Sequence, residues 1–123
     1  MKVIHTDNAP AAVGPYVQAI GTEKFIFTSG QIPLIPATGE LETEIKAASK
    51  QCLENIKAIL TEAGVGLENV IKMTVFLDNI DDFAAMNEVY GEYFSDHKPA
   101  RSAIEVAALP KGAIVEMEAI ASL

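Results

Sequence analysis

The sequence predicts an α/β fold of the α+β two-layer sandwich type, with a six-stranded mixed sheet and two helices on one of its faces. Strand-like and helix-like segments follow one another in the order β-ββ-α-β-α-ββ along 123 residues. Half of the residues are hydrophobic, which is enough for a sizeable core in a single domain spanning residues 1–123. Because two helices cannot cover both faces of six strands, we expect the uncovered face to be polar or to meet another subunit.

The first forty residues predict three strands and two ordered loops. A short strand is expected near residues 3–4, and longer strands at residues 16–20 and 25–32. Proline and glycine exclude helix from residues 7–15 and 33–39, and the apolar residues there indicate loops that pack against the domain.

A helix is predicted over residues 43–63, because apolar residues recur there at steps of three and four. The stripe consists of Ile45, Ser49, Cys52, Ile56, Ile59 and Ala63, widened by Leu53 and Leu60. Gly64 is placed to end the helix. Cys52, the only cysteine, is interpreted as a buried structural thiol rather than a nucleophile, since no cationic residue lies beside it.

A strand at residues 69–78 and a second helix come next. Alternate residues of the strand are expected to share one face, namely Ile71, Met73, Val75 and Leu77. The helix is expected to begin at a cap formed by Asp81 or Asp82 and to end near Phe94. Its apolar stripe consists of Phe83, Met86, Tyr90, Tyr93 and Phe94, with Asn87 at the edge.

The chain ends in two predicted strands, at residues 101–107 and 113–122, joined by a turn at residues 109–112. In the first strand we expect the apolar side chains to lie under the helices, so the alternate residues should point to the uncovered face: Arg101, Ala103, Glu105 and Ala107. If the two strands pair through the turn, Arg101 and Glu116 come to lie on one side of a hairpin.

Arg101 is the only arginine in the chain, against eight lysines. Its planar guanidinium can grip a carboxylate with two parallel hydrogen bonds, which a lysine cannot do. One interpretation is that Arg101 binds the carboxylate of a small substrate, next to a glutamate that handles protons or water. The other is an ordinary structural salt bridge with an acidic residue. The residues alone leave both interpretations open.

The composition weighs against several function classes. A net charge of −8 and a pI of about 4.6 argue against nucleic-acid binding, which relies on clustered basic residues. His5 and His97 are isolated, so no metal site is expected. We predict neither a signal peptide nor a membrane span, and expect a cytoplasmic protein. The mean hydropathy of +0.23 is high for a small monomer and indicates a buried subunit interface.

Several separated motifs resemble those of the RidA family, also called YjgF, in the same order and across nearly the whole chain. The similar segments are residues 9–16, 28–33, 75–83 with Asn87, 99–102, 105–106 and 115–119. The last three are similar to the C-terminal signature of the deaminase-type members, which contains the arginine.

The resemblance implies a 2-iminobutanoate/2-iminopropanoate deaminase. Such an enzyme hydrolyses 2-aminoacrylate and related enamines or 2-imino acids to 2-keto acids and ammonia, without a cofactor. The resemblance also implies a chorismate mutase-like fold and a homotrimer, with the sheets around a central barrel and clefts between subunits. It implies that Arg101 pairs with the substrate carboxylate and that Glu116 positions or activates water. The other residues it places at the cleft are Tyr16, Ser29 and Asn87, with the backbone around Gly30 and Ala103 close to the ligand.

Two departures and two alternatives accompany this resemblance. Many relatives carry a cysteine where this chain has Ala103, so thiol-dependent behaviour is absent there, and Ala108 replaces a basic residue common in close relatives. One alternative is a non-catalytic trimer that binds a small carboxylate such as a 2-keto acid. The other is an endoribonuclease or translation inhibitor, against which the negative charge weighs. We expect neither nucleic acid nor a membrane as partner.

Overall fold

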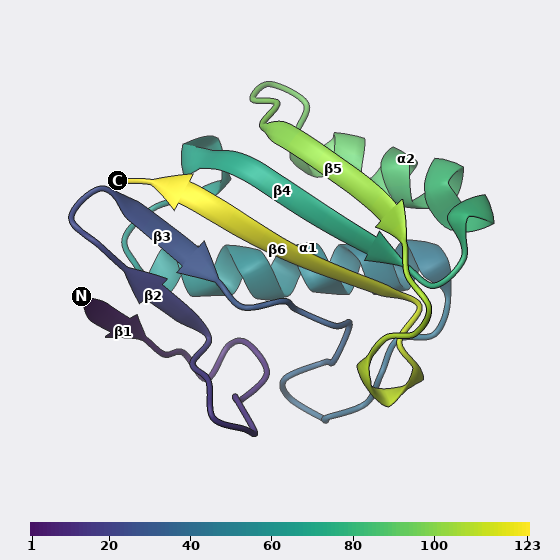
Figure 1. The fold of residues 1–123 in the computed structure, drawn as a ribbon, viewed down its shortest axis with the longest axis horizontal. Coiled ribbons are helices and arrows are strands. Elements are labelled where there is room, and N and C mark those ends of the chain that lie inside the picture. Colours follow the sequence, from purple (N-terminus) through teal and green to yellow (C-terminus); the bar gives the residue numbers. More distant parts are fainter.

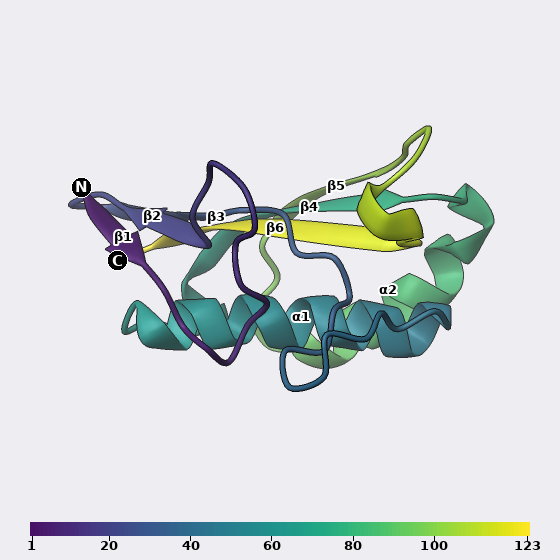
Figure 2. The ribbon, with the colours of Figure 1, turned by 90° about the horizontal axis from the view of Figure 1, so that it is seen from below.

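The computed structural model describes residues 1–123 and has two layers, a six-stranded sheet and two α-helices that lie against the same face of it (Figures 1 and 2). The strands are β1 (Lys2–Ile4), β2 (Ala19–Gly21), β3 (Phe25–Thr28), β4 (Val70–Leu77), β5 (Ala100–Glu105) and β6 (Val115–Ser122). The helices are α1 (Ile45–Glu62) and α2 (Phe83–Tyr93), with 3₁₀ turns at Leu67–Asn69, Ile80–Asp82 and Pro110–Gly112. The predicted element order and the two-layer architecture are confirmed. Neither helix combines the length and the apolar character needed to cross a bilayer.

The strands are arranged in the order β1-β2-β3-β6-β4-β5, so β6 lies in the middle of the sheet. It runs antiparallel to both β3 and β4, whereas β5 pairs in parallel with β4 at the edge. The prediction that the last two strands form a hairpin is therefore wrong, because β4 separates them. Helix α2 connects β4 to β5, which runs parallel to β4 at the edge of the sheet. The segment after β5 then crosses β4, and β6 enters the sheet between β4 and β3.

Both ends of helix α1 are defined by capping residues. The Glu44 carboxylate accepts hydrogen bonds from the backbone N–H groups of Lys46 (3.1 Å) and Ala47 (2.9 Å), which makes Glu44 the N-terminal cap. At the other end Gly64 adopts a φ of +86°, and its N–H donates to the carbonyl of Thr61, as the sequence predicts. The buried stripe includes Cys52, whose thiol pKa is raised by burial, so the thiol is structural as predicted.

The second half of the chain differs from the sequence prediction in two local details. The register of β4 against β6 shifts between Val70 and Lys72, so Val70 is buried and Ile71 is 43% exposed. Ile71 therefore does not share the buried face of the strand, contrary to expectation. Asp82 occupies the N-cap position of α2 as predicted, but its side chain makes no capping hydrogen bond. A 3₁₀ turn precedes the helix, and there Asn79 accepts the hydrogen bond from the N–H of Asp81 (2.9 Å).

Candidate active site

The predicted site residues form two groups on opposite faces of the sheet. The first, here called the arginine cluster, lies where β5 meets α2 and contains Arg101, Asn87 and Ala103. The second, here called the glutamate cluster, lies on the face away from the helices and contains Glu116, Gly30, Ser29 and Tyr16. Strand β4 lies between β5 and β6, so one chain does not bring the two clusters together.

Arg101 points toward the helices rather than toward the open face of the sheet. It pairs with Met73 on β4, and Ala103 pairs with Val75, and both β4 residues are completely buried beneath the helices. Neighbours in register share a face, so Arg101 and Ala103 lie on the helix side. Ile104 lies on the open face and is 46% exposed. The predicted alternation of side chains along β5 is confirmed. The prediction that Arg101 and Ala103 point to the uncovered face is wrong, because they point to the helices.

The Arg101 side chain is held by three residues of α2. Its Nη1 donates a hydrogen bond to Oδ1 of Asn87 (2.7 Å). Its Cζ lies 4.6 Å from the ring centre of Tyr90 and 5.4 Å from that of Phe83, both within cation–π range. These three residues occupy positions i, i+4 and i+7 and therefore share one face of the helix.

No carboxylate of the chain pairs with Arg101. The two ion pairs of the structure join His5 with Asp7 and Lys46 with Glu88. Only Nη1 of Arg101 has a protein acceptor, so the edge formed by Nε and Nη2 is available to a ligand. The salt-bridge interpretation therefore does not hold within the chain, and the guanidinium is oriented by an amide and two aromatic rings instead.

Glu116 belongs to the opposite, open face, because its neighbours Val115 and Met117 are completely buried under the helices. Its carboxyl lies against Gly30, where a Cβ would overlap Oε2 and approach Cδ to 2.8 Å. A residue larger than glycine at position 30 would displace the carboxyl group. Burial raises the pKa of Glu116, and the charge of Glu118 adds to the effect. The carboxyl is thus shifted toward the range in which it can exchange protons.

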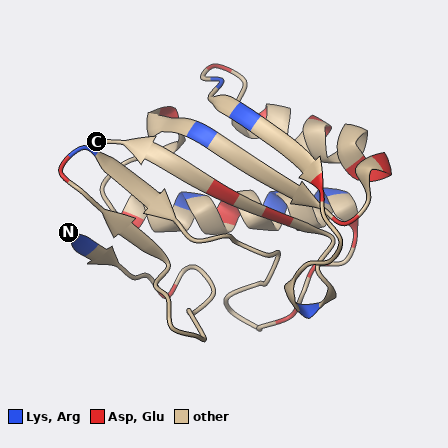
Figure 3. Cartoon of the chain, viewed as in Figure 1, with Lys and Arg blue, Asp and Glu red and all other residues tan.

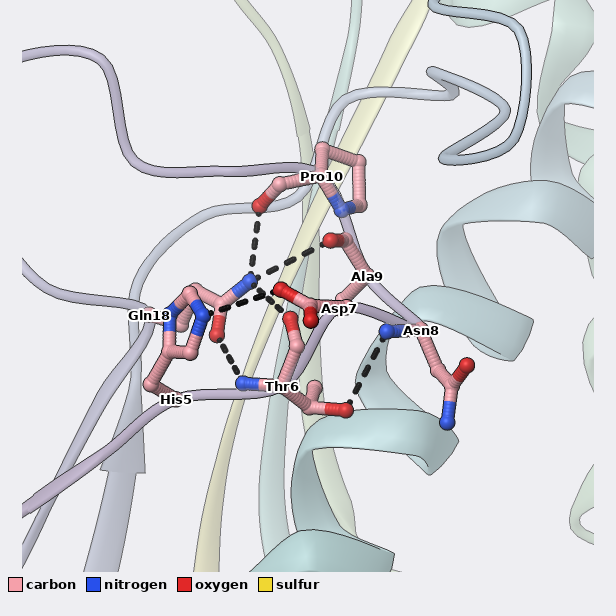
Figure 4. A network of polar contacts seen from close by, with 7 residues as sticks. All are labelled: His5, Thr6, Asp7, Asn8, Ala9, Pro10 and Gln18. Carbon is pink, nitrogen blue, oxygen red and sulfur yellow. Dashed lines mark hydrogen bonds and ion pairs between the residues drawn. The ribbon is translucent and has the colours of Figure 1, made fainter.

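Tyr16 and Ser29 lie near Gln18, since the N–H of Ser29 donates to the carbonyl of Gln18 (2.8 Å). The buried side chain of Gln18 holds the preceding loop in place (Figure 4). Gln18 is 2% exposed and accepts a hydrogen bond from the N–H of Thr6 (2.7 Å) while its amide nitrogen donates to the carbonyl of Pro10 (2.8 Å). Tyr16 and Gly30 line one cavity of about 130 Å³. Tyr16 and Ser29 line a neighbouring one.

Three residues near Arg101 were not predicted as site residues. Phe83 and Tyr90 belong to the predicted apolar stripe of the helix, although their spacing from Asn87 puts all three on one face. Lys98 belongs to a predicted loop, and it lines a cavity together with Arg101. The aromatic pair could have been found from its spacing, whereas the position of Lys98 depends on the tertiary fold.

The sequence matches the family described as endoribonuclease L-PSP over residues 6–123. A RutC family protein of Pyrococcus abyssi is 56% identical over 121 residues, which cover 98% of this chain and 95% of that protein. TdcF of Escherichia coli strain K12, which carries the provisional name of a reactive intermediate deaminase, is 47% identical over 98% of this chain and 95% of its own length. The crystal structure of E. coli TdcF with bound serine has a TM-score of 0.97 at 46% identity and covers 100% of this chain and 99% of that one.

Proposed function

Because the chain belongs to the RidA (YjgF) family, whose pattern is described as endoribonuclease L-PSP, we propose that it hydrolyses reactive enamines and 2-imino acids to 2-keto acids and ammonia. The substrate class is 2-aminoacrylate and the imines that it and its homologues form, such as 2-iminopropanoate and 2-iminobutanoate. The observation that carries the proposal is Arg101, the sole arginine, oriented by Asn87 and Tyr90 with one edge open to a ligand. The name of TdcF and the serine in its crystal structure support a small amino-acid-like ligand.

The reaction requires little from the protein beyond position and proton transfer. An imine carbon is already electrophilic, so a water molecule can add to it once the two are held in contact. Arg101 binds the carboxylate of the imino acid and fixes its orientation. Glu116 removes a proton from the attacking water and returns it to the nitrogen. The second proton passes from the new hydroxyl to the nitrogen by the same carboxylate, so the C–N bond breaks, ammonia leaves and the C=O bond forms.

The separation of the two clusters implies that the cleft lies between subunits. Arg101 and Glu116 face opposite sides of one sheet, so a substrate held by both must contact two chains. The apolar side chains of the open face support such an assembly, since Val3, Phe27 and Ile104 are 59%, 44% and 46% exposed. We therefore propose a homotrimer in which each interface brings the arginine cluster of one chain next to the glutamate cluster of another.

The test is to generate 2-iminobutanoate in situ from the amino acid with an amino-acid oxidase and to follow 2-oxobutanoate release with and without the protein. The proposal predicts acceleration over the spontaneous hydrolysis. Binding of 2-oxobutanoate without acceleration would contradict it and identify a non-catalytic carboxylate-binding protein. Cleavage of RNA without acceleration would identify a ribonuclease, against which the acidic centre of the sheet weighs (Figure 3).

A further inference from the structure

A cavity of about 370 Å³ lies beside Arg101, between the C-terminal half of α2 and the start of β5. Asn87 and Tyr90 of α2 and Phe94 just after it form one wall, and Lys98 and Arg101 contribute its two charged side chains. No acidic residue lines it, although the chain contains 17 of them. The cavity is therefore a cationic region in an acidic protein.

Neither cation of this cavity is neutralised within the chain. The ammonium of Lys98 donates a hydrogen bond to the carbonyl of Ser95 (2.7 Å), which orients it and leaves two of its three N–H groups for other acceptors. Pro99 restricts the backbone between Lys98 and the strand that carries Arg101, so the two cations are held in a limited range of relative positions. Two unpaired cations at one cavity favour a ligand with two negative groups.

We infer that the substrates of this protein include 2-imino acids with a second carboxylate, such as 2-iminoglutarate, whose distal carboxylate binds Lys98. This inference rests on the proposed function, and it assigns the 2-carboxylate to Arg101 and the side-chain carboxylate to Lys98. The bond changes are those of the simpler substrates: water adds to the C=N carbon, ammonia leaves, and the 2-keto dicarboxylate is released. Lys98 takes no part in the chemistry and acts on specificity.

The experiment compares Lys98→Gln with a matched control, Lys50→Gln on the exposed side of α1. Each protein is assayed with 2-iminoglutarate and with 2-iminobutanoate, both generated in situ. Lys98→Gln is expected to lower kcat/KM for 2-iminoglutarate by about twofold to fivefold, the effect of an exposed ion pair, and to leave that for 2-iminobutanoate unchanged. An equal loss with both substrates, or no loss with either, overturns the inference.

A binding measurement keeps this inference separate from the proposed catalytic function. Calorimetric titration with 2-oxoglutarate and 2-oxobutanoate does not depend on turnover. Lys98→Gln is expected to bind 2-oxoglutarate more weakly than the wild-type protein does, and to bind 2-oxobutanoate with the same affinity. Failure of hydrolysis with this binding pattern intact would count against the deaminase alone, whereas equal binding of 2-oxoglutarate by both proteins would overturn the role of Lys98.

Discussion

Arg101 has a different environment from the one that its sequence neighbours suggest. The alternation in β5 separates Arg101 and Ala103 from Ser102 and Ile104 correctly, but the more apolar set faces outward. An edge strand is covered on its helix side only by α2, and there Tyr90 and Phe83 accept a guanidinium as readily as an aliphatic side chain. Ile104 is left exposed on the open face of the sheet.

Arg101→Lys is expected to lower kcat/KM for imine hydrolysis by about tenfold to a hundredfold, because charge-assisted hydrogen bonds contribute about 1.5–3 kcal/mol each and an ammonium cannot reproduce the fork. Since Arg101 has no carboxylate partner in the chain, the melting temperature should change little. Hydrolysis and melting temperature are measured on the same preparation. Near-normal hydrolysis together with a clearly lowered melting temperature would reinstate the structural interpretation of this arginine.

Glu116→Gln is expected to lower kcat by about a hundredfold to ten-thousandfold, the usual contribution of an acid–base group.

The raised pKa of Glu116 also predicts how the stability of the protein changes with pH. The folded protein holds the proton of Glu116 to a higher pH than the unfolded chain, so stability falls as the pH rises from the ordinary glutamate range to the raised value. Glu116→Gln should therefore melt at a higher temperature than wild type at pH 7, and at the same temperature near pH 3. A variant that melts lower at pH 7 would contradict this account of the Glu116 environment.

The sequence identifies candidate site residues, but it does not show how the fold groups them. A single arginine and the match to a family signature select Arg101 and Glu116 as candidates. Their opposite faces follow from the pairing of Arg101 with the buried Met73, and their separation follows from β4 lying between β5 and β6. Neither the pairing nor the strand order is encoded by a local pattern. Likewise, the contact between Gly30 and Glu116 joins residues 86 positions apart in the chain.

Helix α2 acts as the support on which the arginine side chain rests. The apolar stripe of the helix turns its completely buried Met86 to the core, while Phe83, Asn87 and Tyr90 present a partly polar surface to Arg101. The hydroxyl of Tyr90 is buried without a hydrogen-bond partner, so the ring, and not the hydroxyl, is what this position supplies.

Two substitutions of Tyr90 test the contributions of its ring and its hydroxyl separately. Tyr90→Phe keeps the ring face and is expected to retain full activity, since the lost hydroxyl has no partner. Tyr90→Leu removes the cation–π contact and should raise the inhibition constant of 2-oxobutanoate by about twofold to thirtyfold. The two inhibition constants are compared well below both melting temperatures, where equal values would show that the ring does not position Arg101.

The secondary structure was easier to predict than the pairing of the strands. Helix α1 follows from its periodic apolar positions and from Gly64, which are local signals. The exposure of Ile71 follows from a register shift at Val70 and Lys72, and such a shift arises from cross-strand packing that the sequence of one strand does not contain.

The two faces of the sheet differ: the helices cover one, and the other is exposed and carries apolar side chains. The helix side of the sheet encloses a continuous core of 22 buried residues, whereas the open side carries exposed Phe25, Phe27 and Ile104 around the acidic β6 (Figure 3). A surface of this kind is typical of a subunit interface. We propose that each catalytic cleft takes Arg101 from one chain and Glu116 from its neighbour.

Mixed oligomers of two variants with strongly reduced activity test this proposal most directly. Arg101→Lys and Glu116→Gln chains are unfolded together, refolded in equal amounts and assayed for 2-iminobutanoate hydrolysis, with each variant refolded alone as the control. Random association in a ring pairs an intact arginine with an intact glutamate at about a quarter of the interfaces, so about a quarter of wild-type activity is expected. Activity no higher than the average of the two separate variants would contradict a cleft shared between chains.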